Sequence, residues 1–401
     1  MHPVTLHVCI PAMNERAFLP ETLECLARQD IHEFTVTLCV NQPDTWHDIY
    51  EKQSICENNA ETLEFIRRFN AFPIHLIDKS SKGNGWTANE GGVGSARKTA
   101  MDAVVKSAHP SDLLVSLDAD TVINPGYLRS IRSNFQHHPS AVALSVPYYH
   151  RLTNDERANR AILRYEIYMR NYALNLWRIA CPYNFTALGS AIALRASAYR
   201  SVGGMTPKKS GEDFYFLQKL RKYGTVLTDN SEKAYPAARF SDRVFFGTGP
   251  AMIKGDLGDW ESYPVYHFEI FDRIRQTYDA FETLFNQDIE TPMSPFLRAL
   301  FKEQNLWGPL RENFRDPRKF IRACHEKVDA LRILQYLKTE QSLSQKTDEE
   351  NLREYLIAFH PDAPCIPDSG FLFDTATVDT LDQIRNFLAT KEELVQKKGS
   401  W

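Results

Sequence analysis

Short apolar runs alternate with amphipathic segments over the first 150 residues, and this alternation limits the fold more than any other feature of the 401-residue chain. The apolar runs lie at 6–11, 35–41, 74–78 and 113–118, with helix-like spacing of apolar residues between them. Strands that alternate with helices build βαβ units, in which the strands run parallel. We therefore expect an α/β fold with a Rossmann-like, mainly parallel sheet flanked by helices.

Polar residues follow three of these runs, in the segments PAMNE (11–15), NQPD (41–44) and DAD (118–120). In open parallel sheets, ligands bind beyond the carboxyl ends of the strands. We therefore expect all three segments to face one common crevice.

After Thr153 the pattern becomes helical. TNDE predicts a capping box between Thr153 and Glu156 at the start of a long helix. One face of that helix carries a stripe that we interpret as core, formed by Ala158, Ile162, Tyr165, Met169, Tyr172 and Leu176.

The last third of the chain is mostly helical and polar, with an expected exposed connection at 340–351. We predict two domains: one at 1–265 and a helical C-terminal extension at 266–401.

The charge and the cysteine content limit the classes of protein to which this chain can belong. The formal net charge is -4 and no long basic block occurs, which argues against a nucleic-acid partner. The seven cysteines form no CxxC pair, so we expect thiols in a reducing compartment. The N-terminal residues lack the features of a signal peptide, and no apolar run approaches the roughly 18 residues of a membrane span. We expect a cytoplasmic protein, and peripheral association with a membrane stays open.

Asp118 and Asp120 stand one residue apart at the end of an apolar run. In an extended segment both side chains point to the same side. Mg²⁺ and Mn²⁺ prefer carboxylate and phosphate oxygens, so the pair is a candidate cation site. The alternative is a solvated turn, because aspartate is common after strands.

Two functions compete for this D-x-D pair. In the first, the cation bridges the diphosphate of a nucleotide-sugar and stabilises the departing phosphate. In the second, LLVSLDADTV resembles the nucleophile strand of haloacid-dehalogenase-like phosphatases, which depend on Mg²⁺. That family carries the motif on its first strand, whereas about a hundred residues of βα pattern precede it here, and this order favours the first function.

An ordered set of motifs makes the resemblance more specific: LHVCIPAMNE, ARKTAM, LVSLDAD, GSAIALR, VGGM and GED, within about residues 4–230. The set resembles family-2-like glycosyltransferases of the GT-A fold. The resemblance implies hexosyltransferase-like activity (EC 2.4), with inversion at the sugar carbon and with Mn²⁺ or Mg²⁺. It also implies that 1–265 is the nucleotide-sugar-binding and catalytic domain. The donor would be a nucleotide-diphosphate sugar such as a UDP-sugar, and the acceptor an unidentified glycan, lipid or small molecule. A non-catalytic nucleotide-sugar-binding protein of the same fold stays as a further alternative.

The resemblance also implies roles on the nucleotide side. Pro11 and Ala12 would supply backbone contacts to the nucleotide, while Asn14 and Glu15 shape the turn; Asn14 as a plain helix cap is the alternative. Asn41 stands where the family often carries an acid that reads the base, and its amide leaves the choice of base open.

For the diphosphate side, Arg97 would lie near the phosphates, with Lys98 in place of the asparagine usual in the family. Asp118 would contact ribose and metal, and Asp120 the metal. His267 is a candidate third metal ligand, and a packed core histidine is the alternative.

The GED motif would supply the catalytic residues. Asp213 would be the base that takes the proton of the acceptor hydroxyl, with Glu212 beside it; alternatively both acids merely favour the positive end of a helix. The Gly-rich segment 238–252 carries Arg239 and Arg243, and we expect Arg243 to contact the donor phosphates unless it forms a structural ion pair.

Overall fold

The computed structural model describes residues 3–87, 90–208, 211–241 and 247–399. The chain divides into two compact units. The first is built from the residues up to Ile162 and from Phe185–Leu257, and the second from Leu163–Asn184 and Gly258–Lys398. The catalytic and extension roles expected for 1–265 and 266–401 stay predictions.

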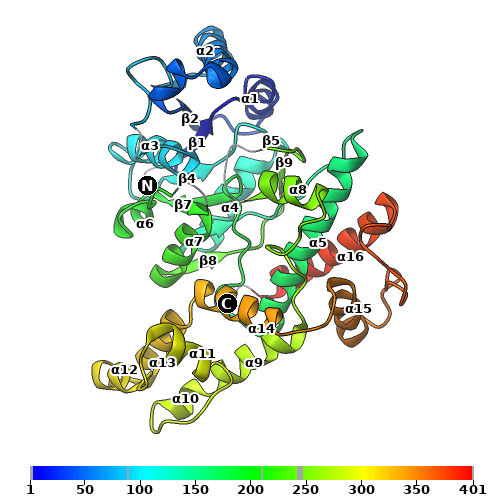
Figure 1. Ribbon diagram of the computed structural model, residues 1–401. Coiled ribbons are helices and arrows are strands. Elements are labelled where there is room, and N and C mark those ends of the chain that lie inside the picture. Colours follow the sequence, from blue (N-terminus) through cyan, green and yellow to red (C-terminus); the bar gives the residue numbers. More distant parts are fainter. Residues whose placement is uncertain (1–2, 88–89, 209–210, 242–246, 400–401) are drawn as a thin grey trace. The chain divides into compact units, whose positions relative to one another are not determined.

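Within the described residues, the first unit contains a seven-stranded sheet with the strand order β3-β2-β1-β4-β7-β6-β8 (Figure 1). Its strands are β1 (Leu6–Ala12), β2 (Phe34–Asn41), β3 (Ile74–Lys79), β4 (Leu113–Ser116), β6 (Ala141–Ser145), β7 (Ile192–Arg195) and β8 (Thr225–Leu227). Neighbouring strands run parallel except at β7, which is antiparallel to both β4 and β6. The predicted α/β fold with a mainly parallel sheet is confirmed.

Helices pack on this sheet (Figure 1). Helix α3 (Val93–Val105) contacts β1 and β2, α2 (Gln53–Arg68) contacts β2 and β3, and α7 (Glu212–Tyr223) contacts β6 and β8. The unit also contains α1 (Leu19–Ala27), α4 (Tyr127–His137), α6 (Ala196–Ser201), α8 (Thr248–Asp256) and the 3₁₀ helices Asp44–Asp48 and Tyr50–Lys52. Central strands covered by helices are buried on both faces, which explains why all five residues of 113–117, Ser116 included, are fully buried.

A second, two-stranded sheet joins β5 (Thr121–Ile123) to β9 (Ala234–Pro236) in antiparallel register. Thr121 lies opposite Pro236. This pairing brings the segment just before β5, which is DAD, close to the segment just after β9.

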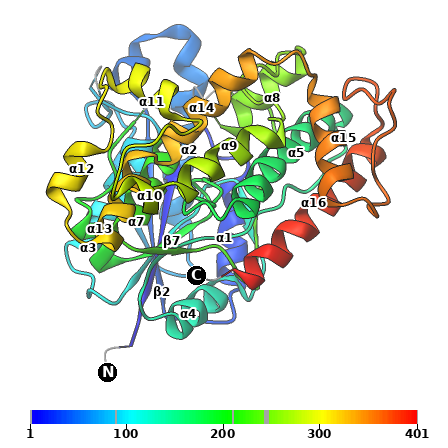
Figure 2. The same cartoon turned by 90° about the horizontal axis from the view of Figure 1, so that it is seen from below.

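The second unit is helical in the residues that the structure describes. It includes the larger part of α5 (Glu156–Arg178), together with α9 (Phe268–Asp279), α10 (Phe281–Leu284), α11 (Ser294–Phe301), α12 (Gly308–Asn313), α13 (Pro317–Lys327), α14 (Ala330–Ser342), α15 (Asp348–Phe359) and α16 (Val378–Lys398). Helices α9 and α14 run side by side (Figure 2). The C-terminal helices expected from the sequence are confirmed.

Buried charges join α16 to α5 inside the second unit. Arg170 lies 2.7 Å from Glu392 and 2.9 Å from Glu166, and all three side chains are at most 4% exposed. Arg385, also buried, lies 3.5 Å from Glu166. Removing one partner would leave an uncompensated buried charge, so we assign this network to the stability of the helical unit.

The predicted capping box at Thr153 is wrong. Helix α5 begins at Glu156, and the Asp155 carboxylate accepts the backbone N–H groups of Arg157 and Ala158 at 3.0 and 3.2 Å. Asp155 is therefore the N-cap residue, because it directly precedes the helix and its carboxylate reaches the backbone N–H groups of the first turn.

A capping box does form at α15, where Thr347 accepts from the Glu350 N–H and the Glu350 side chain accepts from the Thr347 N–H. It lies inside the stretch expected to be an exposed connection, which shrinks to residues 343–347. The apolar stripe of α5 is buried or partly buried, so its interpretation as core is confirmed.

In the described part of the chain, none of the helices combines the length and the apolar character that crossing a membrane requires. The seven cysteines are thiols, as predicted.

Candidate active site

The three polar segments begin at one edge of the large sheet. Strands β1, β2 and β4 are parallel neighbours, and they end at Ala12, Asn41 and Ser116. PAMNE, NQPD and DAD therefore start from the same edge, because parallel strands share the direction of their carboxyl ends.

Asn41 ties the ends of two of these strands together. Its amide nitrogen donates to the carbonyl oxygen of Ala12 at 2.9 Å, and its amide oxygen accepts from the Trp86 indole N–H at 3.1 Å. Pro11 is tolerated in β1 because β4, its neighbour on one side, has already ended opposite Cys9. The expected nucleotide contacts of Pro11, Ala12 and Asn41 stay predictions.

Asn14 gives the PAMNE turn its shape. Its φ is +59°, in the left-handed region that asparagine tolerates better than most residues. The Asn14 N–H donates to the Asn59 side-chain oxygen at 2.8 Å, which holds the turn against α2. The carboxylate of Glu15, the next residue, is nearly fully buried.

Replacing Asn14 with alanine should lower the free energy of unfolding by about 1 kcal/mol, because alanine pays a steric cost at positive φ. Glycine adopts positive φ without that steric cost, so the free energy of unfolding of Asn14→Gly should stay closer to that of the wild type. Urea denaturation of the three proteins measures both changes, and an alanine variant as stable as the glycine variant would contradict this origin of the turn.

Arg97 is a buried arginine that joins two of the predicted motifs. Its side chain is 2% exposed. One terminal nitrogen donates to Asp118 Oδ1 at 2.9 Å, and Nε lies 3.5 Å from Glu212 Oε1. The other terminal nitrogen donates to Ser116 Oγ at 2.5 Å and to the Gly189 carbonyl at 2.8 Å. DAD and GED, which are about a hundred residues apart in the sequence, therefore meet at this guanidinium.

Gly189 is required by the position of Arg97. A Cβ atom built at residue 189 would lie 2.3 Å from Arg97 Nη2, much closer than such contacts allow. The glycine of the GSAIALR motif thus leaves room for the guanidinium, a reason that the sequence motif does not reveal.

Glu212 and Asp213 form the first turn of α7, after Gly211 in the left-handed region at φ +72°. The Asp213 side chain is partly buried and accepts the Phe214 N–H at 2.7 Å. Burial, and then the charge of Glu212, raise the pKa of Asp213 to about 7, although Arg97 opposes this. Burial also raises the pKa of Glu212, against the same opposition. A carboxyl group with a pKa near neutrality suits general-base catalysis.

Asp120 is held by a second arginine, Arg239. The guanidinium of Arg239 donates to Asp120 Oδ2 at 2.6 and 3.0 Å and to both oxygens of Glu15 at 2.7 Å. The β5–β9 pairing explains the contact, since Asp120 precedes β5 and Arg239 follows β9. Burial raises the pKa of Asp120, and Arg239 opposes the change.

We call Glu15, Asp118, Asp120, Glu212 and Asp213 the carboxylate cluster. Among the contacts given above for the described residues, these five carboxyl groups interact with the guanidinium groups of Arg97 and Arg239, so acidic side chains are in surplus there. Such a surplus would repel a diphosphate and attract a divalent cation.

Among the described residues, no group of three or more His, Cys, Asp and Glu side chains gathers to hold a metal ion. Mg²⁺ commonly takes only one or two protein carboxylates and completes its shell with phosphate oxygens and water. The donor set of Asp118 and Asp120 therefore fits a cation that arrives with a diphosphate.

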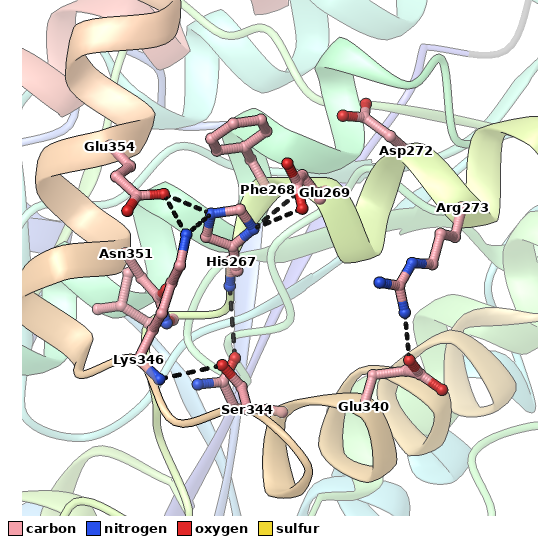
Figure 3. Close-up of polar contacts among 12 residues, drawn as sticks. His267, Phe268, Glu269, Asp272, Arg273, Glu340, Ser344, Lys346, Asn351 and Glu354 are labelled. Atoms are coloured by element: carbon pink, nitrogen blue, oxygen red, sulfur yellow. Dashed lines mark hydrogen bonds and ion pairs between the residues drawn. The ribbon is translucent and has the colours of Figure 1, made fainter.

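His267 lies in the second unit (Figure 3). It caps α9 by accepting the Glu269 N–H, and its Nε2 lies 2.7 Å from a Glu354 oxygen and 3.2 Å from Lys346 Nζ. Its role as a third metal ligand stays a prediction. Arg243 falls outside the described residues, so its expected phosphate contact also stays a prediction. Arg239, in the same Gly-rich segment, makes the contacts given above.

Residues 113–247, from β4 to the start of α8, match the family model described as glycosyl transferase family group 2. Among solved structures, S. aureus TarS 1-349 in complex with UDP-GlcNAc is 17% identical over 99% of this chain and 93% of that chain, with a TM-score of 0.41. The mannosyltransferase PcManGT from Pyrobaculum calidifontis, in complex with GDP-Man and Mn2+, is 15% identical over 98% and 88%, with a TM-score of 0.39. Comparison with curated proteins gave no match.

Proposed function

We propose that the protein is an inverting glycosyltransferase that uses a nucleotide-diphosphate sugar, from the premise that residues 113–247 match the model of glycosyl transferase family group 2. The observation that carries the proposal is the meeting of Asp118 with Glu212 at the buried guanidinium of Arg97. A motif suited to binding a cation and a motif suited to taking a proton are thereby held beside each other.

In the proposed reaction, Asp213 accepts the proton of the acceptor hydroxyl as that oxygen bonds to the anomeric carbon. The bond from this carbon to the diphosphate breaks on the opposite face, and the electron pair leaves with the nucleoside diphosphate. Glu212 stays paired with Arg97 and keeps a negative charge next to Asp213, which raises its basicity. Asp118 and Asp120 lie on the diphosphate side.

A divalent cation, Mn²⁺ or Mg²⁺, would be held by Asp118 and Asp120 and would neutralise charge on the diphosphate. The surplus of acidic side chains in the carboxylate cluster supports this requirement. PAMNE and Asn41, at the same edge of the sheet, would hold the nucleotide, with UDP as the first candidate.

The phosphatase alternative receives no support from the family match. Asp118, which would be its nucleophile, instead has one oxygen bound to the buried Arg97. A non-catalytic binding protein of the same fold would bind the donor but would not transfer its sugar, so a measurement of turnover distinguishes it from the enzyme.

The rate should follow the ionisation of Asp213. Because a base acts in its deprotonated form and the pKa of Asp213 is raised to about 7, kcat/KM should rise about tenfold per pH unit below neutrality and level off above it. The same raised pKa makes stability change with pH in the opposite direction to the rate. The folded state binds the proton more tightly than the unfolded state, so the free energy of unfolding falls as pH rises from the ordinary aspartate pKa towards 7.

Initial rates from pH 5 to 9, with unfolding midpoints over the same range, measure both effects. A rate profile that is flat between pH 5 and 7 would contradict the assignment of the base.

Release of nucleoside diphosphate tests the function itself. The protein is incubated with UDP-, GDP- and dTDP-sugars, Mn²⁺, and a mixture of glycan, lipid and small-molecule hydroxyl acceptors. We expect one donor to yield its nucleoside diphosphate and a glycosylated acceptor with inverted anomeric configuration. Donor binding without any turnover would instead identify a binding protein, and release of inorganic phosphate a phosphatase.

A further inference from the structure

Arg239 contacts the second acid of DAD, Asp120, whereas Arg97 contacts the first, Asp118. Its guanidinium bridges Asp120 and Glu15 and stacks 3.9 Å from the centre of the Phe18 ring. The Asp120 side chain is 13% exposed and that of Glu15 is 4% exposed, so both carboxylates would be poorly solvated without this partner.

The two arginines that neutralise DAD are held differently. Arg97 is 2% exposed and is fixed by Ser116 and the Gly189 carbonyl in addition to its acids. Arg239 is 20% exposed and follows a strand of only three residues, Ala234–Pro236. Of the two guanidinium groups, that of Arg239 is therefore the one that can leave its carboxylates at lower cost.

We propose that Arg239 is an exchangeable cation: it neutralises Asp120 and Glu15 while the donor is absent, and it yields Asp120 when a divalent cation arrives with the diphosphate. This inference rests on the proposed function. A guanidinium and a divalent cation compete for the same carboxylate oxygens, because each needs the negative charge that the other has neutralised.

The released guanidinium has a second use. Its planar fork matches phosphate oxygens as well as it matches carboxylates, so Arg239 can turn from Asp120 to the donor diphosphate while Glu15 keeps it in place. Arg239 would then oppose binding of the free metal ion and favour binding of the donor. A residue that only supported the fold would change the affinities for the metal ion and for the donor in the same direction, or would change neither.

Arg239→Gln separates these two effects. Binding of Mn²⁺ without donor is followed by the electron paramagnetic resonance signal of the free ion, and donor binding at saturating Mn²⁺ by calorimetry. Loss of a competing ion pair should tighten Mn²⁺ binding about tenfold, whereas loss of a phosphate contact should weaken donor binding by about the same factor. Arg157→Gln is the control, because Arg157 makes an exposed ion pair with Asp256 in the same unit, and it should change neither affinity.

Asp120→Asn in the Arg239→Gln background should abolish the gain in Mn²⁺ affinity. If Arg239→Gln fails to fold, as judged by near-ultraviolet circular dichroism, Arg239→Lys takes its place, since a single ammonium bridges the two acids less well and should shift both affinities in the same directions.

Mn²⁺ binding that is unchanged or weaker in the variant, beside a wild type that binds donor, would overturn the exchange and leave the proposed function standing. A folded wild type that binds no nucleotide-sugar with Mn²⁺ would overturn both.

Discussion

Asp213→Asn should lower the rate of sugar transfer by about 10²–10⁴-fold, the usual contribution of a general base. The amide keeps the shape of the side chain and can still accept the Phe214 N–H, but it cannot take the proton of the acceptor. Donor affinity should stay within about twofold, because the diphosphate side of the cluster is intact. Single-turnover rates and donor calorimetry on the variant measure the two quantities separately.

Two further results complete this test. The pH dependence of the remaining activity should disappear in Asp213→Asn, since the titrating group has been removed. Asp48→Asn, which alters an exposed ion pair with Lys82, should leave rate and affinity unchanged. An Asp213→Asn variant that retains a tenth or more of the wild-type rate would assign the base to another residue.

Arg97→Met should lower the free energy of unfolding by about 3 kcal/mol, the lower end of what breaking a buried ion pair costs. Most of the loss comes from Glu212, which is 4% exposed and, without Arg97, must either stay charged in an apolar surrounding or take up a proton. Asp118 contributes less, because it is 33% exposed and partly screened by water. Urea denaturation followed by far-ultraviolet circular dichroism measures the change.

Gly189→Ala provides an independent approach to the same contact. The added methyl group would displace the Arg97 guanidinium and should destabilise the protein in the same direction without removing any charge. Arg97→Met with a free energy of unfolding within 1 kcal/mol of the wild type would contradict the role given to this arginine.

The sequence predicts those parts of the fold that depend on neighbouring residues. The runs at 6–11 and 113–117 are mostly apolar because β1 and β4 are buried in the sheet, and their alternation with helical segments is enough to indicate parallel strands. That β1 and β4 are neighbours is shown only by the structure. Reasoning from neighbouring residues fails at Thr153. The TNDE sequence predicts a capping box there, but the helix is capped by Asp155, the residue directly before it.

The contacts of the two arginines could not be predicted because they depend on register between distant segments. Arg239 reaches Asp120 through two strands of three residues each, and such short strands leave no periodic signal. Arg97 was expected near the diphosphate, yet its burial follows from the space left by Gly189, 92 residues away in the sequence. The charge types alone led to the prediction of a cation site at DAD, and that site stays a prediction.

Calorimetric titration with UDP-, GDP- and dTDP-sugars, in Mn²⁺ and again in EDTA, tests most directly whether DAD holds a cation against a sugar diphosphate. We expect one of these donors to bind in Mn²⁺, with at least a tenfold loss of affinity in EDTA and a comparable loss in Asp120→Asn. Donor binding of equal strength in Mn²⁺, in EDTA and in Asp120→Asn, or no binding of any donor by the folded protein, would contradict the account.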